Sequence, residues 1–109
     1  MGYDICFRAR LAGTSQMVSV GDDINHTSNT AEMVHEVCGS YPSDWDMMKC
    51  RALFPIVARG ASKLARFPEK YRKYEPDNGW GSVESTQRFL SKIADNCSMY
   101  PTAIVEVDY

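Results

Sequence analysis

A chain of 109 residues is long enough for one hydrophobic core and too short for two, so we expect residues 1–109 to form a single domain. Its composition, with 44% hydrophobic and 24% charged residues, excludes a disordered or fibrous chain. The formal net charge of -2 argues against a protein that binds nucleic acid through bulk positive charge.

The first residues lack the basic segment and apolar run of a signal peptide, and no apolar stretch approaches the length of a membrane span. We therefore expect a cytoplasmic protein without membrane contact. The cysteines contain no C-x-x-C pair, which predicts free thiols. Because no complete set of metal ligands is visible either, we expect no bound metal, and we expect no cofactor. These cysteines are Cys6, Cys38, Cys50 and Cys97.

The N-terminal part of the chain predicts a β-hairpin. Residues 3–11 alternate between apolar and polar side chains, which is typical of a half-buried strand. Residues 12–16 are turn formers, residues 17–20 form a short second strand, and residues 21–23 should end it.

A first helix is predicted after a loop over residues 24–29. Asn29 is a suitable N-cap for a helix over residues 30–38, with Glu32 at the third helical position and Gly39 at the end.

A second helix is predicted after a loop over residues 41–46, starting near Met47. Pro55 should kink or split this helix, because proline lacks the backbone donor and clashes with the preceding turn. Pro68 should end it, and residues 69–74 add one more helical turn.

The C-terminal part predicts a turn-rich loop over residues 75–81, a helix over residues 83–97 capped by Ser82, and a strand over residues 102–108. The order ββ-ααα-β predicts an α+β domain with a three-stranded sheet, helices on one face, and the third strand beside the first. Two strand edges then stay exposed, which favours a homo-oligomer.

Consecutive polar side chains precede the first predicted helix. Free backbone N–H groups at a helix start attract anions, so this segment could bind a phosphate or the polar edge of a ring. The same residues could instead serve only as helix caps and local turns. They are Asn25, His26, Thr27, Ser28 and Asn29.

A second candidate is the loop before the last helix, where Trp80 stands between two glycines and follows Asn78 by two positions. The indole could stack on a ligand ring while Asn78 binds the polar edge of that ring. Alternatively, Trp80 could be a core residue held by a tight turn.

A third candidate is a row of cations at helical spacing, on the side opposite the expected core face. This row could contact an anion or a partner, or it could be a solvated helix face. Its members are Arg59, Lys63, Arg66 and Lys70.

His35 and Cys38 lie one helical turn apart, a spacing that can place two metal ligands on one face. The sequence supplies neither the remaining zinc ligands nor an orienting group for a nucleophile.

Three motifs follow one another over nearly the whole chain, at residues 25–29, 76–81 and 100–103. In this order they make the sequence similar to a family of small phage and prophage proteins with an N-x-T-S-N loop and a later N-G-W-G loop. The resemblance implies a phage accessory protein in the host cytoplasm. Small phage proteins of this kind often counter host immunity, either by inhibiting CRISPR effectors or by sequestering nucleotide immune signals.

The leading hypothesis is a non-catalytic protein that sequesters a small anionic or nucleotide ligand, with residues 25–29 and 78–80 as the two walls of one pocket. The alternative is a protein–protein inhibitor of a host defence complex such as a CRISPR effector, with exposed aromatic anchors. These anchors would be Tyr41, Trp45, Tyr71 and Tyr74. A small enzyme acting through His26 or His35 is the third hypothesis.

Overall fold

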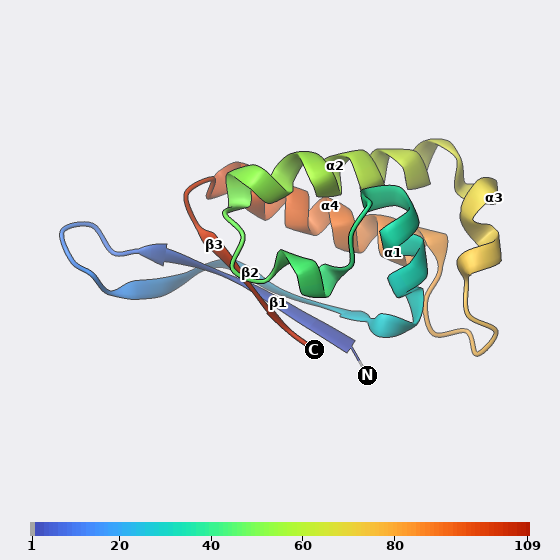
Figure 1. Cartoon of the computed structure of the whole chain (residues 1–109), viewed down its shortest axis with the longest axis horizontal. Helices are drawn as coiled ribbons and strands as arrows, with labels where there is room; N and C mark the ends of the chain where they lie inside the picture. The colour runs from blue at the N-terminus through green and yellow to red at the C-terminus, as the bar shows by residue number, and fades with distance from the viewer. Residues whose placement is uncertain (1) are drawn as a thin grey trace.

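Strand β1 (Gly2–Arg10) is the centre of a three-stranded antiparallel sheet in the computed structural model, which describes residues 2–109. It lies between β2 (Met17–Thr27) and β3 (Ile104–Asp108), so the strand order is β2-β1-β3. The helices cover one face of this sheet, and the β1–β2 hairpin extends beyond the helical layer (Figure 1). The predicted α+β class and strand order are confirmed.

The alternation of β1 places its apolar side chains against the helices. Ile5 lies opposite Ile24 of β2 and Val107 of β3, and Phe7 lies opposite Val105. All five side chains are buried, because residues that pair directly across strands share one face of the sheet. This pattern is the reason that the sequence predicts the core side of the sheet correctly.

Strand β2 is longer than the sequence predicts, because residues 21–23 form an irregularity in the strand and do not end it. The register shifts between the pairs Ile5–Ile24 and Phe7–Val20. Gly21 has φ 68°, and a Cβ there would lie 2.1 Å from Asn96 Oδ1. The helix that carries Asn96 comes so close that only glycine fits, and the strand continues beyond this point.

Within residues 2–109, the helical layer contains four α-helices and three short 3₁₀ turns. They are η1 (Ser28–Thr30), α1 (Ala31–Cys38), η2 (Pro42–Trp45), α2 (Cys50–Arg66), α3 (Pro68–Tyr71), η3 (Arg72–Tyr74) and α4 (Val83–Met99). Helices α2 and α4 lie side by side, and α1 packs against α2 (Figure 1). Helix α2 continues through Pro55 without a break.

The helix starts differ from the sequence prediction in two places. Helix α1 begins one residue later than expected and Asn29 does not cap it, because η1 precedes it and Thr27 Oγ1 accepts the N–H of Asn29. Helix α2 begins at Cys50 instead of near Met47, since the backbone before it bonds to β3. In that segment the N–H of Met47 donates to the carbonyl of Val105 at 2.7 Å.

Both outer strands are partly covered, which sequence reasoning did not anticipate. The extended segment before α2 bonds along β3, and Lys49 forms a bridge with Ile104. On the other side, the N–H of Asp22 in β2 donates to Asn96 Oδ1 of α4 at 2.9 Å. The structure therefore leaves less unpaired strand edge for self-association than a bare three-stranded sheet would.

The homo-oligomer stays a prediction. We expect light scattering at micromolar concentration to give twice the mass of one chain or more, because parts of β2 remain unpaired. A monomeric mass would contradict this prediction, and the partly covered edges would then be its explanation.

Replacing Gly60 of α2 by alanine should destabilise the protein, although this change usually stabilises a helix. Glycine inside a helix normally lowers the stability of the helix by about 0.5–1 kcal/mol relative to alanine. Here a Cβ would lie 2.4 Å from Cys38 Sγ and 3.1 Å from Leu90 Cδ1. We therefore expect Gly60→Ala to lower the free energy of unfolding by about 1–3 kcal/mol in a urea titration.

The matched control is Ser62→Ala on the exposed face of the same helix, which should change stability by less than about 0.5 kcal/mol. Adding Cys38→Ala to Gly60→Ala should recover part of the loss, because it removes the clashing sulfur. A stabilised Gly60→Ala protein would show that α1 and α2 separate easily at this point.

Candidate functional site

The two polar loops singled out in the sequence lie side by side. Helices α1 and α4 start at the same end of the sheet, and Gly81 before α4 approaches the end of β2. A Cβ at Gly81 would lie 3.0 Å from Thr27 Cγ2 and 2.6 Å from Thr30 Cγ2. This close approach places the Trp80 loop against the end of β2.

A shallow, widely open hollow of about 490 Å³ lies between this loop and the sheet, and we name it the Trp80 hollow. Trp80 is 70% exposed, so the alternative interpretation of a core tryptophan is wrong for this residue. The core tryptophan is Trp45, which is fully buried and donates from Nε1 to Ser40 Oγ at 2.8 Å. The hollow is lined by Gly2, Tyr3, Asp4, Asn25, His26, Thr27 and Trp80.

The backbone around Trp80 is held by its own turn. Asn78 Oδ1 accepts the N–H of Trp80 at 2.9 Å, while Gly79 and Gly81 have φ values of 77° and 120°. Side chains other than glycine rarely adopt such φ values. Asn78 therefore shapes the loop and does not line the hollow. The sequence had suggested that Asn78 contacts the ligand directly.

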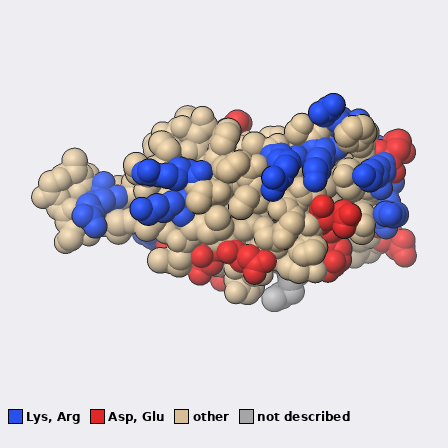
Figure 2. Space-filling view, turned by 45° about the horizontal axis from the view of Figure 1, so that its top comes forward, with Lys and Arg blue, Asp and Glu red and all other residues tan. Residues whose placement is uncertain are grey.

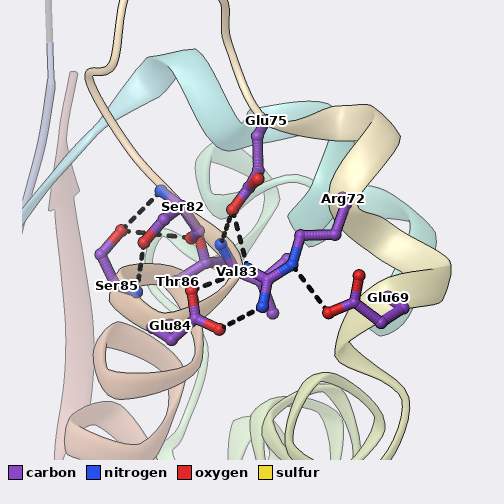
Figure 3. Close-up of polar contacts among 8 residues, drawn as sticks. All are labelled: Glu69, Arg72, Glu75, Ser82, Val83, Glu84, Ser85 and Thr86. Atoms are coloured by element: carbon purple, nitrogen blue, oxygen red, sulfur yellow. Dashed lines mark hydrogen bonds and ion pairs between the residues drawn. The ribbon is translucent and has the colours of Figure 1, made fainter.

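A charged cluster closes the Trp80 loop at its base (Figure 3). Arg72 donates to both carboxylate oxygens of Glu84 at 2.8 and 2.7 Å, and to Glu75 at 3.1 Å. Glu75 also accepts the N–H of Val83, the first residue of α4, at 2.8 Å. The hydrogen bonds from Arg72 lower the pKa of Glu84 to about 2.

The first turn of α4 has the predicted cap at Ser82. Its hydroxyl oxygen accepts the N–H of Ser85 at 3.0 Å, and Ser85 Oγ accepts the N–H of Ser82 at 2.9 Å. The reciprocal pair fixes the start of the helix directly after the Trp80 loop. Together with the charged cluster, it holds both ends of the loop in place.

His26 is a strand residue on the helical side of β2, not a loop residue as predicted. Its ring stacks on Phe89 of α4 with centroids 4.5 Å apart. Its Nε2 lies 2.8 Å from Thr30 Oγ1 and 3.3 Å from Thr86 Oγ1, and both threonines are fully buried. Burial, with a smaller contribution from Arg88, lowers the pKa of His26 to about 4.

A second hollow, of about 290 Å³, lies between β2 and α4, and we name it the Arg88 groove. Asn25 and His26 line both hollows, so the two adjoin at the end of β2. The groove is lined by Asp23, Ile24, Asn25, His26, Ser85, Arg88, Phe89 and Lys92.

Sequence reasoning missed the cations of this groove, although a signal was present. Ser85, Arg88 and Lys92 recur at i, i+3 and i+7, which is one face of a helix. That signal resembles any solvated helix face, and only the tertiary structure places it opposite the polar end of β2.

Two predicted site residues lie outside both hollows. Asn29 is exposed and its N–H donates to Thr27 Oγ1 at 3.2 Å, while Ser28 is half-buried in η1. Neither residue lines the Trp80 hollow or the Arg88 groove. Of the predicted segment, Asn25, His26 and Thr27 are therefore the residues that face a cavity.

The predicted basic row lies on the helical layer, away from both hollows. Lys and Arg side chains form separate groups over the helices and not one continuous patch (Figure 2). Two of the cations contact aromatic rings beside them, Arg66 at 5.4 Å from the Phe67 centroid and Lys70 at 5.7 Å from that of Tyr71. Arg59 and Lys63 lie near Cys38, whose pKa they lower slightly against the larger effect of burial.

The prediction of exposed aromatic anchors is wrong for two of its four residues. Trp45 is fully buried and Tyr71 is only 4% exposed, because both belong to the hydrophobic core. Tyr41 and Tyr74 are half-buried, with Tyr41 stacked on His35 at a centroid distance of 4.4 Å.

The thiols and the second histidine do not form a reactive pair. Cys38 is buried, which raises its pKa to about 12, whereas His35 is exposed. In the described part of the chain, residues 2–109, no three His, Cys, Asp or Glu side chains are placed to hold a metal ion. Over the same residues, no helix combines the length and apolar character needed to cross a membrane.

Comparisons with protein-family models, curated proteins and solved structures give no match.

His26 predicts a pH dependence of stability. Its pKa is about 4 in the folded protein and 6.5 when exposed, so between these values the unfolded chain binds more protons. The contribution of neutral His26 to the free energy of unfolding is complete above pH 6.5 and is lost as the pH falls towards 4. Urea unfolding across this range should show a shallower decline for His26→Gln than for the wild type.

His35→Gln is the matched control, because it removes the other histidine of the chain, which is exposed on α1 and lies outside the junction that His26 forms with Phe89. Parallel profiles for wild type and His26→Gln would contradict the burial of a neutral His26.

Proposed function

We propose that this chain is a non-catalytic binding protein that captures a small anionic ligand containing a planar ring, with a nucleotide as the leading class. The single observation that carries the proposal is the exposed Trp80 beside the polar end of β2. An indole exposed to 70% in a hollow of about 490 Å³ is available for stacking.

The walls of the Trp80 hollow suit the edge of a nucleobase. Asp4 supplies carboxylate oxygens that accept hydrogen bonds from an exocyclic amine, and the Asn25 amide can both donate and accept. Stacking of a base on an aromatic side chain contributes about 1–3 kcal/mol. The hollow thus offers stacking and hydrogen bonding together.

Capture is favoured over catalysis by the state of the possible nucleophiles and bases. Burial raises the pKa values of Cys38, Cys50 and Cys97, so their thiolates are scarce near neutral pH. His26 has a lowered pKa and its Nε2 lies between two buried hydroxyls. This environment suits a histidine that positions other groups better than one that transfers protons.

The biological setting of the proposal comes from the resemblance to small phage proteins. On that basis the protein is an anti-defence product that acts in the host cytoplasm by sequestering a nucleotide immune signal. The alternative is a protein–protein inhibitor of a host defence complex such as a CRISPR effector. The exposed Trp80 is compatible with this alternative too, because an exposed tryptophan can anchor a protein partner.

Native mass spectrometry of the protein purified from phage-infected cells distinguishes these two functions. A bound small molecule of nucleotide mass supports sequestration. A host protein complex retained without any small molecule supports the inhibitor.

Trp80→Ala tests the role of the indole. We expect binding of nucleoside monophosphates, measured by calorimetry with AMP, GMP, CMP and UMP, to weaken about 5- to 150-fold for the nucleotides that bind. Stability should change by less than about 0.5 kcal/mol, because the side chain is 70% exposed.

The control is Phe54→Ala, which removes another partly exposed aromatic ring, on α2 and away from the hollows. It should leave nucleotide affinity unchanged. Unaltered affinity in Trp80→Ala, or no binding of any of the four nucleotides by the wild type, would contradict the proposed function.

A further inference from the structure

We propose that the Arg88 groove is the phosphate subsite of this protein, so that its ligand is a nucleotide carrying one phosphate group, with the base on Trp80. The inference rests on the proposed function of the Trp80 hollow and assigns a second, separate site to the same ligand. It draws on residues of α4 that no sequence motif marked.

The groove is held open at fixed positions between β2 and α4. At one end, the N–H of Asp22 donates to Asn96 Oδ1, and Asn96 Nδ2 donates to the carbonyl of Lys92 at 2.8 Å. At the other end, His26 stacks on Phe89. Between these two contacts the strand and the helix leave the volume of about 290 Å³.

The cations of the groove have no ion-pair partner within residues 2–109. The ion pairs of the described chain involve Arg8 and Arg72, while Arg88 and Lys92 take part in none. One carboxylate, Asp23, lines the groove with them. Two cations against one carboxylate leave a net positive wall in a protein whose overall charge is -2.

The charged donors that remain for an anion are the two cations. Ser85 also lines the groove, but its hydroxyl is already engaged with Ser82 in the helix cap. Arginine binds phosphate oxygens with paired N–H groups, and lysine adds a mobile charge. This donor set suits a tetrahedral oxyanion better than a planar ring.

The two hollows adjoin along β2, since Asn25 and His26 line both. Lining residues of β2 run from Asp23 to Thr27, about 14 Å of strand. Trp80 lies at the Thr27 end, as the approach of Gly81 shows. A base at this end and a phosphate nearer Asp23 follow the strand edge, with Asn25 and His26 between them.

The charge balance favours one phosphate group over three. A phosphate monoester carries about -1.5 to -2 charges at neutral pH, which two cations can neutralise. A triphosphate carries more negative charge than two cations can neutralise, and the groove also contains the carboxylate of Asp23. The Trp80 hollow is lined by an acidic residue, Asp4, and by no lysine or arginine, so the phosphate belongs in the groove.

The test compares nucleotides with their nucleosides in calorimetric titrations, using AMP, GMP, CMP and UMP beside the four matching nucleosides. For the best-binding base we expect the monophosphate to bind more tightly than the nucleoside. Arg88→Gln and Lys92→Gln should each weaken the monophosphate about 10- to 100-fold and leave the nucleoside unchanged. The triphosphate of the same base should bind no better than its monophosphate.

Arg51→Gln is the matched control, because it removes an exposed cation from α2 outside both hollows. It should bind the monophosphate like the wild type. Thermal unfolding of all variants confirms that the folds compared are the same.

Failure of the subsite and failure of the proposed function give different results. Equal affinities for nucleoside and monophosphate, both reduced by Trp80→Ala and unaffected by Arg88→Gln, would overturn the phosphate subsite alone. No binding of any nucleoside or nucleotide by the wild type would overturn both. A monophosphate affinity that depends on Arg88 and on Trp80 supports both.

Discussion

The contact of His26 with the start of α4 is the interaction on which the candidate site depends. The ring stacks on Phe89 and its Nε2 lies between the hydroxyls of Thr30 and Thr86. One side chain thus joins the end of β2, the turn before α1 and the first turns of α4. The Trp80 hollow and the Arg88 groove adjoin at this residue, so both depend on the same buried junction.

The Trp80 loop keeps a large apolar side chain in solvent, so the fold loses the free energy that burying the indole would contribute. A side chain exposed in this way needs a rigid support. Asn78 and the left-handed glycines set its backbone, and the Arg72 cluster ties its base to α4. None of these supporting residues lines the Trp80 hollow. A ring that binds to Trp80 therefore meets a loop that is already ordered, which lowers the entropic cost of binding.

Where sequence reasoning failed, a partner distant in the sequence decided the local structure. Residues 21–23 have turn-forming composition, yet the strand continues because Asn96 accepts the N–H of Asp22. Asn29 has the chemistry of an N-cap, yet Thr27 caps the preceding 3₁₀ turn. Trp45 was interpreted as a surface anchor, although the core around it leaves it fully buried.

The sequence by itself determined the α+β class, the cap at Ser82 and the two polar segments, since these follow from periodicity and from contacts within a few residues. The strand order was also predicted correctly, but from the general packing rules of such elements and not from a local pattern. Only the tertiary structure decided that Trp80 is exposed, that His26 is half-buried against Phe89, and that Arg88 and Lys92 face β2. A local pattern shows which residues share a face of one element. It contains no information about which other element that face meets, and this pairing decides between a solvated helix face and a binding groove.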